Sequence, residues 1–228
     1  MYDLIGDIHG YATPLKHLLN KLGYTERDGV WQHPERQVVF LGDFVDRGPE
    51  QVETVRIARA MVEAGQALAV MGNHEFNAVA WATEDPEAPS QYLRSHSDKN
   101  RNQHQAFLDQ VGQYSEQHRD MIDWFRTLPL YLDLDGLRVI HACWHPPSLE
   151  NLRDYTDEQQ RILKDAWPAL CRKGTVPYDA LETTVKGLEV PLPQGHRFFD
   201  KDGNPRHHIR TRWWELERLT YSARATGI

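Results

Sequence analysis

The segment Gly42-Asp43-Phe44-Val45-Asp46-Arg47-Gly48-Pro49 contains the side chains best suited to chemistry. It holds two carboxylates and a guanidinium in one turn, directly after the apolar run 38–41. A carboxylate such as Asp43 can offer an oxygen to each of two divalent cations, and the planar fork of Arg47 suits phosphate oxygens. Asp46 is spaced to orient a neighbouring base. The segment indicates phosphate chemistry, although an ordinary acidic loop with an Asp–Arg ion pair would have the same composition.

Three further polar segments follow apolar runs in the same way. They are Gly6-Asp7-Ile8-His9-Gly10, Gly72-Asn73-His74-Glu75 and His141-Ala142. The first three of the four segments each belong to a strand, polar loop, helix unit, so we expect a largely parallel sheet with right-handed crossovers. The loops of such a sheet lie together at its carboxyl edge. Residues far apart in the sequence therefore converge there.

The helices of these units have clear signals. Thr13 as N-cap and Pro14 at the first helical position predict a helix that ends at Gly23. A second helix is predicted over about 50–64, with Gly65 after it, and a third begins at Phe76.

The later part of the chain is less regular. We expect an exposed excursion over 84–103, helices near 104–112 and 116–127 with Ser115 as N-cap of the second, and a hairpin of 130–134 and 137–140 on the Asp135-Gly136 turn. Beyond it we expect a charged helical stretch to about 169, irregular chain through Gly174 and Pro177, a hairpin of 197–199 and 207–210 around 200–204, and a weak helical pattern over 215–228. No strong apolar strand is evident after Ile140.

Length and composition favour one domain over 1–228, because 228 residues with 40% hydrophobic side chains can form a single core. Within it we distinguish a motif-bearing core (1–145), a helical excursion (146–190), and a hairpin and tail (191–228).

The net charge of −7 argues against extended nucleic acid as a partner. Cys143 and Cys171 form neither a disulfide framework nor a CxxC motif, and we expect free thiols. The absence of a basic, apolar leader and of a long apolar run predicts a cytoplasmic protein without a membrane partner.

The candidate metal ligands are oxygen and imidazole donors: Asp7, His9, Asp43, Asn73 and His141. This mixture suits Mn, Fe, Zn, Co or Ni rather than an all-oxygen calcium site. In a two-metal hydrolase the cations lie about 3.5–4 Å apart, share a carboxylate and a hydroxide, and orient in-line attack on phosphorus. Asp43 is the candidate shared carboxylate. His74 could protonate the leaving oxygen with Asp46 orienting it, whereas helix capping and solvation is the alternative role for a His-Glu pair.

In order and spacing, the four segments resemble the motifs of the calcineurin-like metallophosphoesterases. The Asp46-Arg47-Gly48 sequence is most similar to the phosphoprotein-phosphatase branch, which includes serine/threonine phosphatases and bacterial dinucleoside-tetraphosphatases. The resemblance covers about residues 3–145. It implies an αββα sandwich of mixed sheets with βαβ units. It also implies Asp7, His9 and Asp43 on one metal, Asp43, Asn73 and His141 on the other, His74 as general acid with Asp46, and Arg47 on the phosphate.

The sequence departs from the family pattern near its end. The family completes the second metal site with a histidine in a late Gly-His, and the only such pair here is Gly195-His196, at the start of a predicted hairpin. His196 is therefore a weak candidate ligand, with His145, His207 and His208 as alternatives. We expect a chain cut short, with an incomplete second sheet and an under-liganded second metal. The Trp213-Trp214 pair could line the groove, although hairpin or core packing is favoured.

These features predict a metal-dependent phosphoesterase that hydrolyses a phosphomonoester or phosphoanhydride, with two divalent ions and manganese preferred. The alternative is an impaired family member that binds a phosphorylated ligand or protein without turnover. A nuclease or phosphodiesterase is disfavoured by Asp46-Arg47-Gly48 and by the acidic balance. The substrate could be a phosphoprotein, a dinucleoside polyphosphate or a small phosphomonoester, and the oligomeric state stays open.

Overall fold

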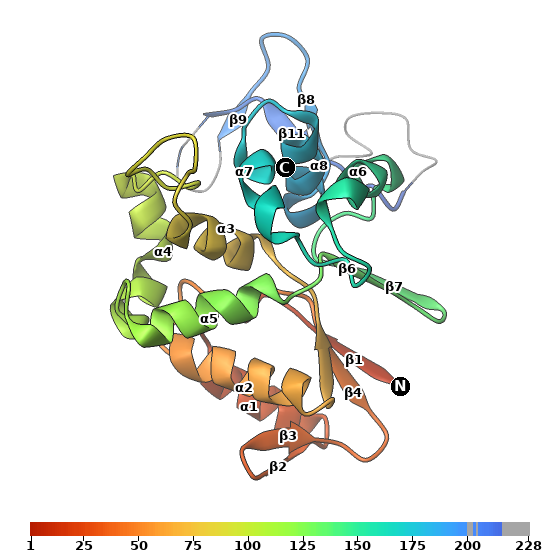
Figure 1. Cartoon of the computed structure of the whole chain (residues 1–228). Helices are drawn as coiled ribbons and strands as arrows, with labels where there is room; N and C mark the ends of the chain where they lie inside the picture. The colour runs from red at the N-terminus through yellow and green to blue at the C-terminus, as the bar shows by residue number, and fades with distance from the viewer. Residues whose placement is uncertain (200–202, 204, 216–228) are drawn as a thin grey trace.

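The core of the fold is a three-stranded parallel sheet. The computed structural model describes residues 1–199, 203 and 205–215. Strands β1 (Tyr2–Ile5), β4 (Gln37–Phe40) and β5 (Ala67–Ala69) form the sheet in the order β1-β4-β5, and both pairs are parallel. Figure 1 shows this sheet in the lower half of the molecule. The three polar loops consequently leave the sheet at the same edge, as the sequence predicts.

A helix follows each strand of this sheet. They are α1 (Ala12–Lys21), α2 (Gln51–Glu63) and α3 (Asn73–Ala82), and a small hairpin of β2 (Thr25–Arg27) and β3 (Val30–Gln32) lies between α1 and β4. The predicted start of α1 is wrong by two residues, because the helix begins at Ala12 and Thr13 does not cap it. The Thr13 hydroxyl donates instead to the Glu50 carboxylate over 2.6 Å, and the Thr13 amide donates to the same carboxylate over 2.9 Å. Thr13 thus ties the start of α1 to the start of α2.

The two faces of the sheet bury different layers. Strand side chains alternate between faces, so Val38 and Phe40 enter the main core with α1 and α2, whereas Val39 points the other way. Val39 packs with Val70 and Val139 in a second apolar cluster. Val139 belongs to the hairpin of β6 (Tyr131–Leu134) and β7 (Leu137–Ile140), which the sequence predicts. The hairpin therefore forms a second β layer, in agreement with the expected αββα arrangement.

Beyond the sheet the helices differ from their predicted bounds. The structure contains α4 (Asp98–Val111), α5 (Glu116–Arg126), α6 (Pro146–Leu152), α7 (Trp167–Cys171) and α8 (Val176–Lys186), with 3-10 turns η1 (Arg153–Tyr155) and η2 (Lys164–Ala166). Helix α4 begins earlier than predicted because Ser97 caps it, accepting from the Asn100 amide. The predicted long helix to about 169 is broken because Asp157 accepts the amides of Gln159 and Arg161 and forms a turn.

Pro177 lies in the first turn of α8 rather than in irregular chain, a position where its missing N–H costs nothing. Thr175 caps this helix by accepting from the Tyr178 amide. Helix α8 packs on α6 in the upper half of Figure 1. The packed pair α6 and α8 forms the centre of the chain segment that follows the hairpin β6–β7.

The last strands form two ladders instead of one hairpin. The sequence predicts that 197–199 pairs with 207–210. Strand β9 (Phe198–Phe199) pairs instead with β10 (Pro205–Arg206), and β11 (His208–Arg210) pairs with β8 (Glu189–Pro191). The sequence gives no signal for β8 because it is only three residues long. The predicted turn at 200–204, apart from Gly203, and the weak helical pattern over 216–228 lie outside the described residues. Within the described part of the chain the second β layer is not joined into one closed sheet.

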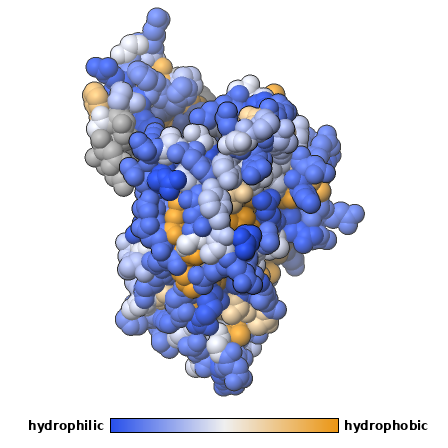
Figure 2. All heavy atoms as spheres, turned by 60° about the vertical axis from the view of Figure 1, so that its left-hand side comes forward, coloured by the Kyte–Doolittle hydropathy of each residue, from blue (hydrophilic) through white to orange (hydrophobic). Residues whose placement is uncertain are grey.

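The described surface is mainly hydrophilic. Figure 2 shows one face on which apolar residues appear as narrow bands between hydrophilic ones. None of the described helices combines the length and the apolar character needed to cross a membrane. Cys143 and Cys171 are both free thiols. Leu4, on the edge strand β1, is 51% exposed.

The burial of His118 on α5 predicts a pH dependence of stability. Its imidazole is 2% exposed, and burial, followed by the charges of His104 and Arg119, lowers its pKa from 6.5 to about 4. The folded protein therefore favours the neutral ring, whose contribution is complete above pH 6.5 and is lost as the pH falls to about 4. We expect that loss to be on the order of 3 kcal/mol.

This prediction can be measured with urea unfolding between pH 7 and pH 4. The variant His118→Gln keeps an acceptor for the Tyr114 amide and removes the titrating group, so its stability should fall less steeply than that of the parent. His17→Gln, on the exposed side of α1, should keep the parental slope. Equal slopes for the parent and His118→Gln would contradict the prediction.

Candidate active site

Two of the three polar loops, those after β1 and β4, adopt strained backbone conformations where the candidate residues lie. Asp7, His9, Asp43, Asp46 and Arg47 all have φ between 49° and 72°. Non-glycine residues rarely adopt this left-handed region, and such residues concentrate at functional sites. Glycines allow the loops to approach one another, since a Cβ on Gly72 would collide with the Asp43 backbone and side chain.

Glu75 joins the second and third loops. Its side chain is fully buried, and its Oε2 accepts from the amides of Asp43 over 2.8 Å and Gly72 over 3.1 Å. Its Oε1 accepts from the amide of Phe44 over 2.8 Å. Burial, and then the negative charge of Asp43, raises the pKa of the Glu75 carboxyl to about 7. One side chain thus fixes the distance between the loop carrying Asp43 and the loop carrying Asn73 and His74.

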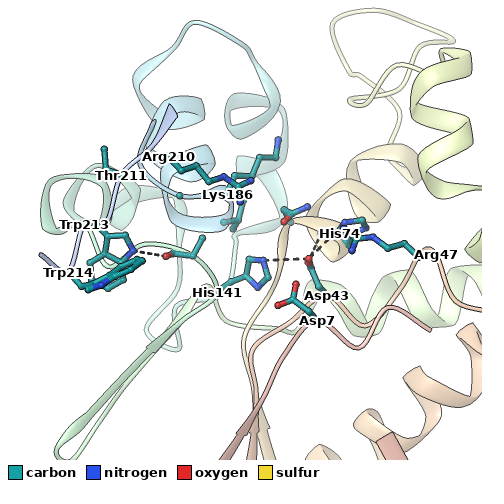
Figure 3. A pocket seen from close by; sticks show the side chains of 14 residues that line it. Asp7, Asp43, Arg47, His74, His141, Lys186, Arg210, Thr211, Trp213 and Trp214 are labelled. Atoms are coloured by element: carbon teal, nitrogen blue, oxygen red, sulfur yellow. Dashed lines mark hydrogen bonds and ion pairs between the residues drawn. The ribbon is translucent and has the colours of Figure 1, made fainter. Parts of the chain in front are cut away.

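Three imidazole rings surround one carboxylate oxygen. The Nε2 atoms of His9, His74 and His141 lie 3.7, 3.9 and 3.6 Å from Oδ2 of Asp43. Figure 3 shows His74 and His141 reaching Asp43 from opposite sides, and Asp7 lies beside it. The sequence-predicted residues Asp7, His9, Asp43, His74 and His141 are therefore brought together.

The histidines are oriented in the manner of metal ligands. Nδ1 of His9 donates to the Val45 carbonyl over 3.0 Å, and Nδ1 of His141 donates to the Leu41 carbonyl over 2.6 Å. Each bond fixes the tautomer that leaves the Nε2 lone pair directed at Asp43. Nε2 of His9 is buried and has no hydrogen-bond partner among the described residues, and burial lowers the pKa of His9. A neutral, unpartnered imidazole beside carboxylates fits a divalent cation.

The donor set admits more than one assignment. Donor atoms of His9, Asp43 and His74 all lie within 4.8 Å of one another. Geometry alone would therefore accept His74 as a ligand, although the predicted role of His74 is proton transfer. The contact made by the other ring nitrogen of His74, Nδ1, distinguishes the two roles.

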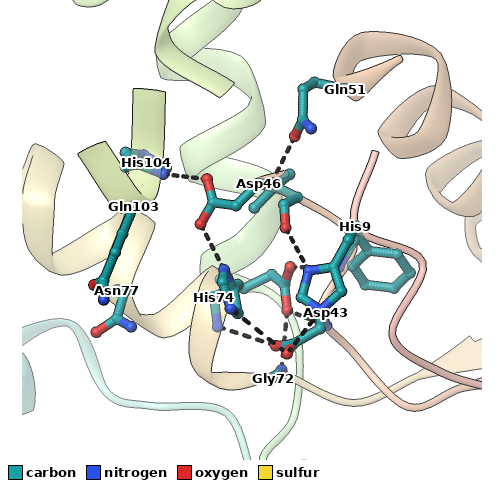
Figure 4. Close-up of polar contacts among 12 residues, drawn as sticks. His9, Asp43, Asp46, Gln51, Gly72, His74, Asn77, Gln103 and His104 are labelled. Atoms are coloured by element: carbon teal, nitrogen blue, oxygen red, sulfur yellow. Dashed lines mark hydrogen bonds and ion pairs between the residues drawn. The ribbon is translucent and has the colours of Figure 1, made fainter. Parts of the chain in front are cut away.

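Asp46 holds His74 from one side and a second histidine from the other. Nδ1 of His74 lies 2.5 Å from Oδ2 of Asp46, and Nδ1 of His104, on α4, lies 2.7 Å from Oδ1. Figure 4 shows Asp46 between the two rings. Burial opposes ionisation of Asp46, but hydrogen bonds from His104 and His74 outweigh it and lower the pKa of Asp46. Burial likewise opposes protonation of His74, yet the bond to Asp46 and the charge of Asp43 raise the pKa of His74.

The site opens into a pocket of about 430 Å³. Arg47 and Asn73 line it, and Arg47 has no hydrogen bond or ion pair within the part of the chain that the structure describes, so its guanidinium is available to a ligand. Residues from the far end of the chain line the opposite wall, namely Lys186, Arg210, Thr211, Trp213 and Trp214. Trp213 donates from Nε1 to the Ala142 carbonyl over 2.9 Å. The tryptophan pair thus lines the groove, contrary to the packing role that the sequence favours.

His196 does not reach this pocket. Its side chain is exposed on the loop before β9, and its Nδ1 bonds to the Gln194 carbonyl of the same loop. His196, the weak candidate for a late ligand, therefore does not line the candidate site, because a turn closed by its amide and the Pro193 carbonyl holds it on the exposed loop. The alternatives are also elsewhere: His145 bonds Ser148 at the start of α6, and His207 and His208 are exposed.

Sequence reasoning missed several residues of the site. Glu75 is part of the Gly72-Asn73-His74-Glu75 motif, and its place three residues after a helix cap is a signal for backbone bonding. His104 has no such signal, because it lies inside a polar helix whose position depends on tertiary packing. Lys186 and Arg210 come from elements that the sequence left irregular or paired differently.

The chain is similar in sequence to known phosphoesterases. Residues 2–209 match the family model described as calcineurin-like phosphoesterase. A protein of Oceanobacillus iheyensis named bis(5'-nucleosyl)-tetraphosphatase PrpE [asymmetrical] is 32% identical over 141 residues, which cover 61% of this chain and 54% of the relative. A Vibrio cholerae protein named bis(5'-nucleosyl)-tetraphosphatase, symmetrical, is 29% identical over 191 residues, covering 82% of this chain and 61% of the relative.

Among solved structures, a cold-active protein tyrosine phosphatase of a psychrophilic Shewanella species has a TM-score of 0.46 and 19% identity, over 66% of this chain and 44% of that one. The chain thus spans between half and two thirds of the length of the two curated relatives.

The position of Glu75 predicts a specific loss of stability in Glu75→Gln. The amide oxygen can keep the bonds from the Asp43 and Gly72 amides, but the amide nitrogen faces the Phe44 N–H and leaves that buried donor unsatisfied. We expect a loss of about 1–3 kcal/mol. Denaturant unfolding at pH 8 measures it, and Glu63→Gln on the exposed side of α2 serves as control. Equal stability of Glu75→Gln and the parent would show that the two loops are held by other contacts.

Proposed function

Because the chain belongs to the calcineurin-like phosphoesterase family, we propose that it is a metal-dependent phosphoesterase that hydrolyses a phosphomonoester or a phosphoanhydride. The observation that carries this proposal is the convergence of three Nε2 atoms on Oδ2 of Asp43. Two relatives are named as dinucleoside tetraphosphatases, which favours a phosphoanhydride as the bond that this chain cleaves.

Asp43 is the proposed shared ligand of two divalent cations. His9 and Asp7 would complete one site, and His141 and Asn73 the other. Cations bound there would supply Lewis-acid charge to the phosphoryl group and activate water for attack. The mixed imidazole and oxygen donors suit manganese, with iron, zinc, cobalt or nickel as the other candidates.

The remaining residues have separate proposed tasks. Arg47 binds the reacting phosphate through its planar fork. His74 donates its proton from Nε2 to the leaving oxygen, since Nδ1 is occupied by Asp46. Asp46 orients His74, and the hydrogen bond from His104 to the other oxygen of Asp46 keeps the carboxylate from rotating. His104 is therefore a positioning residue.

The direct test measures hydrolysis of p-nitrophenyl phosphate and of diadenosine tetraphosphate by the metal-loaded protein, together with its metal content. Turnover of either compound supports the proposal. Bound metal with no turnover of these or of phosphopeptides would favour the alternative, a member that binds a phosphorylated ligand without hydrolysis.

Asp43→Asn is expected to weaken manganese binding strongly, because the substitution removes the charge that both cations would share. Calorimetric titration of Mn²⁺ into chelator-treated protein measures the affinity. Asp133→Asn, in the exposed part of hairpin β6–β7, is the matched control and should bind as the parent does. Two sites of parental affinity in Asp43→Asn would remove Asp43 from its bridging role.

His74→Asn is expected to retain the metals and to lower kcat by about 10²–10⁴-fold, the usual range for a lost general acid. Metal analysis and steady-state kinetics on the same preparation provide the measurement. Loss of one metal from this variant would instead make His74 a ligand, in line with the short distances among His9, Asp43 and His74.

A further inference from the structure

A second pocket adjoins the candidate active site. It has a volume of about 860 Å³ and lies beside α3 and α4. Arg47, Asn73, His74 and Lys186 line both this pocket and the first one. Pockets of roughly 300–1,000 Å³ are typical of small-molecule sites. A ligand held at Arg47 and His74 can therefore extend into the second pocket.

The second pocket is positively charged, although the chain as a whole has a net charge of −7. Its lining cations, among the described residues, are Arg47, Arg94, Lys99, Lys186 and Arg206. Its lining carboxylates are Asp46, which accepts from two histidines, and Asp109, which accepts from Gln105. A concave surface of this charge attracts anions.

Arg94 is the most firmly placed of these cations. Its Nη1 donates to Oδ1 of Asn77 over 2.6 Å, and its Nη2 donates to Oε1 of Gln103 over 3.0 Å. Both acceptors are neutral amides, which fix the guanidinium without cancelling its charge. No carboxylate of the described chain lies within ion-pair distance of Arg94. Two of the five N–H donors of the guanidinium are used in this way, so others remain for a ligand.

The two amides link Arg94 to the candidate active site. Asn77 lies one helical turn after Asn73 on α3, and residues four apart share a helix face. Gln103 directly precedes His104 on α4. Figure 4 shows Asn77 and Gln103 on the side of His74 where His104 also lies. Arg94, Asp46 and His74 all line the second pocket. Arg94 therefore faces the same space as the Asp46–His74 pair.

We propose that Arg94 binds a second, non-reacting phosphate of a polyphosphate substrate whose reacting phosphate is held at Arg47 and His74. This inference rests on the proposed function and deepens it, because it selects compounds with consecutive phosphates over monoesters. Lys99 supplies additional positive charge along the same path, whereas Lys186 is paired with the Glu182 carboxylate. A monoester would leave Arg94 without an anion. Nucleoside triphosphates, dinucleoside polyphosphates and inorganic tripolyphosphate share the required chemistry.

The competing explanation is that Arg94 only ties α3 to α4 through Asn77 and Gln103. That role would affect every substrate equally, since it would act on the position of the two helices. A phosphate-binding role affects only ligands with a second phosphate. The comparison of two substrates in one variant separates the two explanations.

The experiment compares Arg94→Gln with the parent on diadenosine tetraphosphate and on p-nitrophenyl phosphate, with Mn²⁺ present. KM for the tetraphosphate should rise by about 10–100-fold, as expected when a charge-assisted contact is lost. KM and kcat for p-nitrophenyl phosphate should stay within about threefold. Arg101→Gln is the matched control, because Arg101 lies on α4 over the Trp81 ring and does not line the second pocket.

Inhibition provides a readout that does not depend on the leaving group. Arg94→Gln should weaken inhibition by tripolyphosphate and leave inhibition by inorganic phosphate unchanged. Use of ATP beside tripolyphosphate and diadenosine tetraphosphate shows whether the nucleoside contributes. Equal losses on both substrates, or no loss on either, would overturn the proposal. So would a loss confined to acidic phosphopeptides, since the partner would then be a protein.

Two further measurements distinguish a failure of this proposal from a failure of the proposed function and from misfolding of the variant. If the parent hydrolyses neither these two compounds nor phosphopeptides, the proposed function fails, while calorimetry with tripolyphosphate still tests the pocket directly. If Arg94→Gln unfolds, Lys99→Ala removes an exposed cation of the same pocket and should weaken tripolyphosphate binding by a smaller factor. Tripolyphosphate binding that is unchanged in Lys99→Ala and in Arg94→Lys would also overturn it.

Discussion

The bonds from three backbone amides to the buried Glu75 carboxylate are the constraint on which the site depends. Two loops that follow separate strands could slide relative to each other, because a short parallel sheet and one bond, from the His74 amide to Oδ1 of Asp43 over 3.1 Å, leave them loosely joined. Glu75 removes this freedom, since one rigid group accepts from both loops. The positions of Asp43 and of the start of α3 follow from that contact, and with them the distance between His74 and Asp43.

The two aspartates of the second loop have different surroundings and can therefore have different tasks. Asp43 faces three imidazole nitrogens and open pocket, which suits cation binding. Asp46 is enclosed by two imidazole rings and holds the His74 ring in place. Both lie in left-handed backbone, at a cost of about 1–3 kcal/mol each. The packing of Phe44 and Val45 between them, both fully buried, keeps this strained turn in one conformation.

The sequence predicts the parts of the structure that have local signals. Apolar runs followed by glycine and polar residues locate the three parallel strands and their loops, and the Asp135-Gly136 turn locates the hairpin that carries His141. The contribution of His104 could not be predicted, because it depends on how α4 packs against the second loop. Arg94 was missed for the same reason. The pairing of β11 with β8 has no signal in strands of three residues, and hairpin geometry alone could not show that His196 lies away from the pocket.

The order of the site residues along the chain has a consequence for synthesis. His9, Asp43, His74 and the clamping Glu75 all belong to the first third of the chain, whereas His141 follows the hairpin and the tryptophan wall comes from near residue 213. Because chains grow from the N-terminus and early segments can begin to fold first, the nascent protein can assemble one half of the candidate metal site before the ribosome has made the other half. A partly formed donor cluster of this kind would meet metal ions while the rest of the protein is still being translated.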